Sequence, residues 1–322
     1  MPFRKIHLKS LLILAGAAWC PARAASNITF GITSNTAFSL AHYISTENKY
    51  YEAENLKVNA IVAGAAVGVL QQLAAGSLNI AQAATDQSLR AILRGAPIRI
   101  VAGAASNAPF RVVAAKTIGS WSDLKGKTIS VGGLTDVTLY FLRVMARKNG
   151  LADQDYDLLY GGGTPSRFAQ LASGAVAATI LTNPVDFSAL EQGYIDLGSV
   201  PQYLPNWAQN NILTDTRWAL RHRATLVSFL RAHIRATRYI YEPANRDEVV
   251  DILVRYTRTT PQVGAATYDL YIKQQVIARD AALFEDGIKA NFDALIAMGD
   301  LTAPPPLAGF IDGSFLAEAS KP

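Results

Sequence analysis

Small polar residues and glycines occupy the points where predicted strands run into predicted helices. The uncharged candidate ligand-binding residues at these points are Ser34, Asn35, Thr36, Gly64, Ala65, Thr85, Gly133, Thr135, Gly163, Thr164 and Asn183. The first N–H groups of a helix have no partner within the helix, and residues without bulk let a ligand approach them closely. Helix starts of this kind are suited to binding an anionic or hydrogen-bond-accepting group, and not to catalysing a reaction. For each residue the alternative is an ordinary helix cap or tight turn.

Acidic and aromatic residues stand near the same turns. Asp86 and Asp136 fall at predicted helix starts, where an acid is favoured as a cap and by the helix dipole. An acid that turned inward would instead accept a hydrogen bond from a ligand amine or hydroxyl. Asp186 follows Asn183 in the matching turn of the second half and joins the candidate set. Phe38 could stack on a ligand, although such residues more often belong to the core.

Arg167 is the one cation that the sequence places near a predicted ligand-binding turn, three residues after Thr164. Its planar guanidinium could hold a carboxylate or sulfonate through two parallel hydrogen bonds. The alternative, which is slightly favoured, is a structural ion pair across the helix.

Residues suited to catalysis or metal binding are scarce. After residue 24 the chain has three histidines, His42, His222 and His233, and none has metal-ligand spacing to another. No cysteine follows residue 20, and no Gly-x-Ser-x-Gly motif occurs. We therefore predict no catalytic residue, no metal and no cofactor, although a Ser/His/Asp arrangement assembled by the fold stays open.

The elements that position these residues are read most clearly between residues 128 and 150. Residues 128–131 read as a short strand, followed by a glycine pair and a helix start. Val137, Phe141 and Met145 then share one face of a helix that Gly150 is placed to end.

The same pattern occurs 98 positions earlier. This offset places Gly162 on Gly64, residues 128–136 on 30–38, and Gln170-Leu171-Ala172-Ser173-Gly174 on Gln72-Leu73-Ala74-Ala75-Gly76. Three landmarks in one register indicate two copies of strand, helix, strand, helix, strand. The sequence therefore predicts an α/β protein with two related halves.

Residues 1–24 have the features of a signal peptide that is cleaved near Ala24. Arg4, Lys5 and Lys9 precede an apolar run, and Ala22-Arg23-Ala24 is a small-x-small cleavage site. The leader carries four of the 30 basic residues and none of the 25 acidic residues, so 26 basic residues remain against 25 acidic ones. This balance, with no basic stripe, argues against nucleic-acid binding. We expect an exported, periplasmic protein.

Two predicted crossings divide the chain into lobes. Residues 106–109 form the first candidate hinge, and a return crossing falls within 201–211. The predicted division is therefore residues 27–107 plus 208–322 for a discontinuous lobe 1, and residues 108–207 for lobe 2. After residue 214 the pattern predicts mostly helix, including continuous helix over 261–298.

Several of these motifs together resemble a known family. The run Asp123-Leu124-Lys125-Gly126-Lys127, the Leu-Ala-Ala-Gly and Leu-Ala-Ser-Gly landmarks, and Asn183-Pro184 are similar to the solute-binding proteins of ABC importers in the nitrate, sulfonate and taurine group, whose superfamily includes thiamine-pyrimidine synthase-like proteins. The resemblance covers essentially the whole mature chain. It implies a type II periplasmic-binding-protein fold, with two α/β lobes joined by a two-segment hinge.

The same resemblance implies a function. Such a protein, expected to be a monomer, captures a small anionic or zwitterionic organic solute of the sulfonate or carboxylate class. It delivers this solute to a membrane permease and its ATPase. The sulfonate-binding pattern has a Lys-Gly-Ser-Asn type run where this chain has Gly133-Leu134-Thr135-Asp136, which leaves the solute open. A periplasmic enzyme or a ligand-sensing module on the same scaffold are the alternatives.

Overall fold

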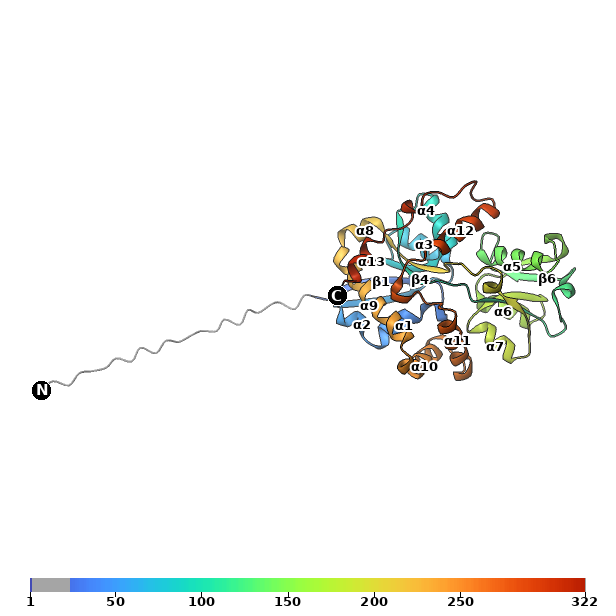
Figure 1. Ribbon diagram of the computed structural model, residues 1–322, viewed down its shortest axis with the longest axis horizontal. Coiled ribbons are helices and arrows are strands. Elements are labelled where there is room, and N and C mark those ends of the chain that lie inside the picture. The colour runs from blue at the N-terminus through green and yellow to red at the C-terminus, as the bar shows by residue number, and fades with distance from the viewer. Residues whose placement is uncertain (2–23, 322) are drawn as a thin grey trace.

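The computed structural model describes residue 1 and residues 24–321, so nearly all of the predicted signal peptide lies outside the described residues. The described strands form two five-stranded sheets, each covered by helices, and Figure 1 shows them as two lobes side by side. The predicted α/β fold class with two lobes is therefore confirmed. Within the described residues, no helix is both long and apolar enough to cross a membrane.

The first sheet has the strand order β2-β1-β3-β10-β4. Its strands are β1 (Ser26–Ile32), β2 (Leu56–Val62), β3 (Ile80–Ala84), β4 (Ile98–Ala105) and β10 (Asn210–Asp215). β1 lies parallel to β2 and β3, whereas β10 lies antiparallel to β3 and β4. A strand from late in the chain thus completes a sheet that begins at residue 26.

The second sheet repeats this arrangement with the order β7-β6-β8-β5-β9. Its strands are β5 (Phe110–Ala114), β6 (Thr128–Val131), β7 (Asp157–Tyr160), β8 (Ala178–Thr182) and β9 (Ile195–Ser199). β5 lies antiparallel to β8 and β9, and so takes the place that β10 has in the first sheet. The two sheets therefore share one topology, with the crossing strand second from an edge.

Helices fill the connections and cover the sheets. Those of the two repeats are α1 (Leu40–Glu47), α2 (Tyr50–Ala53), α3 (Ala66–Ala74), α4 (Thr85–Leu93), α5 (Val137–Lys148), α6 (Thr164–Ala172) and α7 (Val185–Glu191). The offset of 98 residues places α6 on α3 and β8 on β3 from end to end. The internal repeat predicted from sequence is confirmed by these bounds.

The C-terminal part adds helices to the first lobe. They are α8 (Thr216–Arg221), α9 (Arg223–Tyr241), α10 (Arg246–Thr257), α11 (Pro261–Lys273), α12 (Glu285–Ala297) and α13 (Ser314–Ala319). The expected continuous helix over 261–298 is wrong, because the chain turns between α11 and α12. There Gln275 has φ 49° and Asp280 has φ 54°, and Ile277 forms a β-bridge with Ala105 at the end of β4.

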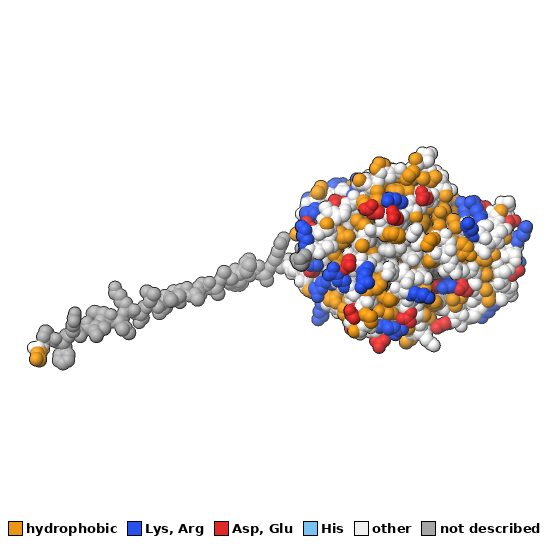
Figure 2. Space-filling model, viewed as in Figure 1, with side chains coloured by type: hydrophobic (Ala, Val, Ile, Leu, Met, Phe, Trp, Pro, Cys, Tyr) orange, Lys and Arg blue, Asp and Glu red, His pale blue; other side chains and the backbone are white. Residues whose placement is uncertain are grey.

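The chain crosses between the sheets twice, from β4 to β5 and from β9 to β10. The two crossings touch, since the Gln209 N–H donates to the Ala105 carbonyl at 2.8 Å. Aromatic side chains fill the junction: the Phe38 ring lies 6.1 Å from Phe110, and Trp207 meets the Phe141 ring edge-on at 4.9 Å. On the face shown in Figure 2, basic and acidic side chains are scattered over both lobes.

Candidate functional site

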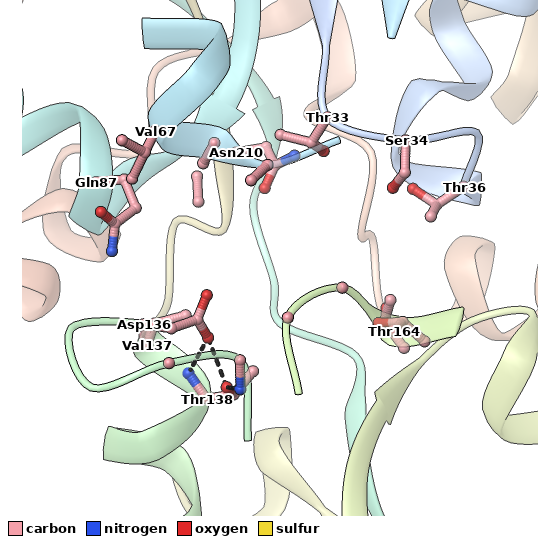
Figure 3. Close-up of a pocket in the computed structure, with 18 of the residues that line it drawn as sticks. Thr33, Ser34, Thr36, Val67, Gln87, Asp136, Val137, Thr138, Thr164 and Asn210 are labelled. Carbon is pink, nitrogen blue, oxygen red and sulfur yellow. Dashed lines mark hydrogen bonds between the residues drawn. The ribbon is translucent and has the colours of Figure 1, made fainter. Parts of the chain in front are cut away.

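A cavity of about 290 Å³ lies between the lobes, at the carboxyl ends of the parallel strands of both sheets. Its first-lobe wall comprises Thr33, Ser34, Thr36, Phe38, Gly64, Ala65, Ala66, Val67, Ala84, Gln87, Gln209 and Asn210. Its second-lobe wall comprises Phe110, Gly132, Gly133, Thr135, Asp136, Val137, Thr138, Gly162, Gly163, Thr164, Arg167 and Thr182. Figure 3 shows the two walls facing each other across the cavity.

Eleven of the residues predicted from sequence line this cavity. They are Ser34, Thr36, Phe38, Gly64, Ala65, Gly133, Thr135, Asp136, Gly163, Thr164 and Arg167. The fold brings them together because each turn follows the carboxyl end of a strand, and those strand ends meet at one edge of each sheet.

Two helices present uncapped N-termini to the cavity. α3 begins after Ala65 and α6 after Gly163, and neither N-cap side chain bonds to the helix. The chain reaches both starts through a glycine with positive φ, Gly64 at 79° and Gly162 at 70°. The first N–H groups of both helices are therefore available to an anionic or hydrogen-bond-accepting ligand.

The third helix start carries a carboxylate. Asp136 caps α5, where its Oδ1 accepts hydrogen bonds from the Thr138 N–H at 2.9 Å and the Thr138 hydroxyl at 2.5 Å. The Gly132 N–H donates in turn to the Thr138 hydroxyl at 2.8 Å. Within the described residues nothing donates to Oδ2, and Figure 3 shows the second carboxylate oxygen directed into the cavity. This part of the wall favours a hydrogen-bond donor over an anion.

Arg167 lies beneath the turn that starts α6. Only 3% of it is exposed, and its guanidinium donates to the carbonyls of Ile180 (2.9 Å) and Gly162 and to the Thr164 hydroxyl (3.1 Å). Burial lowers the pKa of Arg167 to about 10, while the negative charge of Asp136 acts in the opposite direction. The structural ion pair is not found, because among the described residues no carboxylate lies within 4.0 Å of Arg167 and the guanidinium bonds to backbone carbonyls. Because Arg167 lines the cavity, its role as a ligand contact stays a prediction.

One hydrogen bond links the two walls directly. The Gln87 side-chain nitrogen on α4 donates to the Thr135 carbonyl in the second lobe at 2.7 Å. The same nitrogen donates to Asp86 Oδ2 at 2.9 Å. An amide group of the first lobe thus links the two lobes at the cavity.

Asp86 and Thr85 do not line the cavity, because the first turn of α4 directs them into the first lobe. Asp86 is 2% exposed and faces Arg90 at 2.8 Å, while Arg90 also meets Asp300 at 2.7 Å. Burial, and then the nearby charge of Asp136, raise the pKa of Asp86 to about 7. The Thr85 hydroxyl accepts from the Asn211 amide at 2.7 Å.

Three further predicted residues lie outside the cavity wall. Asn183 donates to both carboxylate oxygens of Asp186 at 2.8 Å. Asp186 also faces Arg111 at 3.4 Å, and burial raises its pKa to about 6. Asn35 is exposed at the tip of its turn. Asn183 Oδ1 has no partner among the described residues, but neither Asn183 nor Asp186 lines the cavity.

Sequence reasoning missed several residues of the wall, notably Gln87, Thr182, Gln209 and Asn210. Thr182 and Gln87 are each one residue away from a predicted residue. The predicted turns are therefore correct, but a neighbouring side chain faces the cavity. Asn210 begins β10 and Gln209 precedes it, and the position of β10 within the first sheet depends on pairing with distant strands.

The described residues contain no group of three His, Cys, Asp or Glu side chains that could hold a metal ion. The cavity wall combines backbone N–H groups, hydroxyls, side-chain amides, one carboxylate and one buried guanidinium. These groups can bind and orient a small polar molecule.

Comparison with known families gives one match over most of the chain. The family model described as NMT1/THI5 like matches residues 37–246. No curated protein sequence matches the chain significantly.

Solved structures share the fold at low sequence identity. The ligand-binding component of an ABC-type import system from Staphylococcus aureus, with zinc bound, has a TM-score of 0.78 at 12% identity, and the alignment covers 92% of this chain and 99% of that one. The periplasmic aliphatic sulphonate-binding protein SsuA from Escherichia coli has a TM-score of 0.70 at 17% identity, with 90% and 92% coverage. The desulfurization enzyme DSZB has a TM-score of 0.68 at 14% identity, with 91% and 98% coverage.

Proposed function

This chain belongs to the NMT1/THI5-like family, and on that basis we propose that it is the solute-binding component of an ABC importer. The observation that carries the proposal is the cavity between two lobes, which is lined by helix starts and crossed by the Gln87–Thr135 hydrogen bond. Hinged closure of two lobes around a ligand is a known way to trap a small molecule. The S. aureus and E. coli proteins of similar fold support this reading.

The proposed solute is a small organic anion or zwitterion of the sulfonate or carboxylate class. The uncapped starts of α3 and α6 provide N–H groups for an acid group. A cavity of about 290 Å³ is near the lower end of the range for small-molecule sites, roughly 300–1,000 Å³, so the solute is compact.

The proposed setting follows from the same function. We expect the protein to be exported to the periplasm, cleaved near Ala24, and to act as a monomer. Its partners would be a membrane permease and the ATPase of that permease, which receive the solute when the lobes open.

A thermal-shift assay tests solute binding. Ligand at about 100 times its Kd stabilises the folded state by about 2.7 kcal/mol, which raises the Tm of a chain this long by several degrees. The panel would contain alkanesulfonates, aromatic and aliphatic carboxylates, aminosulfonates, nitrate and pyrimidines. Failure of the whole panel to shift the Tm would count against the proposal.

A matched pair of variants locates the binding. Ala65→Trp places an indole at the cavity end of α3, whereas Ala75→Trp places one at the opposite end of the same helix. We expect the first substitution to abolish the ligand-induced Tm shift and the second to preserve it. Equal shifts in the two variants would place the bound ligand elsewhere.

A periplasmic enzyme on the same scaffold is the second candidate, because DSZB has a similar fold. The two functions differ in their products. A binding protein returns its solute unchanged, whereas an enzyme accumulates product without any transport partner. Mass spectrometry of each stabilising compound after prolonged incubation with the protein separates them.

A further inference from the structure

The second-lobe wall holds a buried hydroxyl group with no hydrogen-bond partner. Thr182 ends β8, is 4% exposed, and lines the cavity. No described atom forms a hydrogen bond with its Oγ1. Buried polar groups are almost always paired, and an unpaired one costs about 1–3 kcal/mol. A bound solute is the missing partner that this position suggests.

A buried cation is bonded to the strand that carries this hydroxyl. The buried guanidinium of Arg167 joins β8 to the start of α6, since it donates to Ile180 in β8 and to Thr164 in α6. No carboxylate of the described chain lies within 4.0 Å of Arg167. The uncapped N-terminus of α6 adds its own partial positive charge. The charge of Asp136 acts on Arg167 without contacting it, so an anionic group at Thr182 would add a closer counter-charge.

A carboxylate lies in another part of the same wall. Asp136 keeps one carboxylate oxygen free of donors and lines the cavity, and Figure 3 shows it apart from Thr164, on the side where Gln87 lies. The first-lobe wall has no charged side chain among the residues that line the cavity. Both charged ends of the site thus belong to one lobe.

We propose that the solute is bifunctional and docks on the second lobe: its acid group binds Thr182 and the start of α6, and its amine or hydroxyl group donates to Asp136. The first lobe then closes over the bound solute with its neutral hydroxyl and amide groups. This inference rests on the proposed solute-binding function. It narrows the solute to acids that carry a second, hydrogen-bond-donating group.

Matched compounds test the requirement for two groups. The probes are β-alanine against propionate, taurine against ethanesulfonate, and γ-hydroxybutyrate against butyrate, each titrated by calorimetry. A hydrogen bond to a charged group contributes about 1.5–3 kcal/mol. In the pair that fits the cavity, the compound with the amine or hydroxyl should therefore bind roughly 10- to 100-fold more tightly than the simple acid of that pair. Simple acids that bind as tightly as their partners would overturn the inference and leave the proposed function intact. No binding by any compound would instead count against the proposed function.

Two conservative variants test the two ends. Asp136→Asn keeps an N-cap acceptor for α5 but removes the charge, and should weaken the bifunctional compound roughly 10- to 100-fold while leaving the simple acid unchanged. Its control is Asp215→Asn, which alters the cap of α8 outside the cavity wall. Equal effects of these two substitutions would contradict the proposed role of Asp136.

Thr182→Val removes the hydroxyl and keeps the shape, and should weaken both members of a pair roughly 3- to 10-fold. Its control is Thr267→Val, which removes another buried hydroxyl without a partner, outside the cavity wall. Because neither hydroxyl has a partner in the described structure, neither substitution should lower the Tm of the free protein. Unchanged affinity in Thr182→Val would show that this hydroxyl does not bind the solute.

Discussion

The two lobes have the same backbone plan and different chemistry. α3 and α6, and β3 and β8, coincide under the 98-residue offset, and both sheets have the same strand order. Under this offset, however, three residues of the second-lobe cavity wall have different counterparts: Asp136 corresponds to Phe38, Arg167 to Val69 and Thr182 to Ala84. The comparison teaches that the repeat determines where the cavity lies, while substitutions in one copy determine what it can bind.

The buried Arg167 of the second lobe needs hydrogen-bond acceptors, whereas its apolar counterpart Val69 in the first lobe does not. Val69 is fully buried and requires only packing. Arg167 is nearly as buried, and its guanidinium is held by two backbone carbonyls and a hydroxyl. Burial of a charge is tolerated when its donors are satisfied. The second lobe therefore depends on a hydrogen-bond network at the place where the first lobe depends on close packing.

Arg167→Met gives the largest expected effect on this comparison. It leaves the Ile180 and Gly162 carbonyls without their donor, and each buried acceptor left unpaired costs about 1–3 kcal/mol, so unfolding should become easier by about 3 kcal/mol. Urea denaturation measures the change. The control is the exposed Arg217→Met, expected to change stability by less than about 0.5 kcal/mol beyond the loss of its pair with Asp215. A loss below about 1 kcal/mol for Arg167→Met would mean that the network is not needed.

Gly64→Ala and Gly162→Ala test the shared backbone. Both glycines have positive φ and no heavy atom within 4 Å of an added Cβ, so only the backbone conformation is strained. Each substitution should cost about 1–2 kcal/mol, by the same amount in both lobes. Gly309→Ala, which has open space and no positive φ, is the control and should be nearly neutral. If urea denaturation showed clearly different losses of stability for Gly64→Ala and Gly162→Ala, the two turns would not be equivalent.

Gln87→Ala removes the hydrogen bond between the lobes at the cavity. A neutral hydrogen bond contributes about 0.5–1.5 kcal/mol, so solute affinity should fall roughly threefold to tenfold as the open form becomes more populated. Calorimetry gives the affinity and small-angle scattering gives the opening. Gln71→Ala, an exposed glutamine on α3, is the control. If the variant were as compact as the unaltered protein and bound the solute as tightly, the Gln87–Thr135 hydrogen bond would not hold the lobes together.

The pH dependence of stability tests one more position at which the two copies differ. Burial raises the pKa of Asp86 to about 7, above its usual value of 3.8, so the folded state binds this proton more tightly than the unfolded chain. Asp86 therefore adds stability as the pH falls from about 7 towards 4, and this contribution is lost as the pH rises again. The matching position in the second lobe is Pro184, which does not titrate.

Asp86→Asn should remove that contribution. Burial lowers the pKa of His42 and His233 to about 4, so both oppose stability as the pH falls below 6.5, but they are unchanged in the variant. The difference in Tm between the original chain and the variant should therefore grow in favour of the original chain between pH 7 and 5. Parallel melting curves would contradict the raised pKa.

The repeat made much of the fold predictable, and side-chain direction limited the prediction of the site. Glycines and hydroxyls at the turns were identifiable because both copies have them. The sequence predicts Thr85 and Asp86 as ligand contacts, whereas Gln87 faces the cavity, because the direction of each side chain at a helix start depends on how α4 packs. The sequence predicts Asn183, whereas Thr182 lines the wall, because β8 ends at Thr182 and the next residue turns inward to Asp186. β10 was expected only as part of a crossing, because its partners lie more than 100 residues away.

The paired crossings limit the motion that could empty the cavity. Both strands that begin at the crossings, β5 and β10, are bonded on each side within a sheet, and the crossings are bonded to each other through Gln209 and Ala105. Two tethers that run side by side resist sliding and leave one easy rotation, about a line through both. We therefore expect the lobes to rotate about an axis through the two crossings. The cavity should then open to solvent on the side farthest from residues 105 and 209.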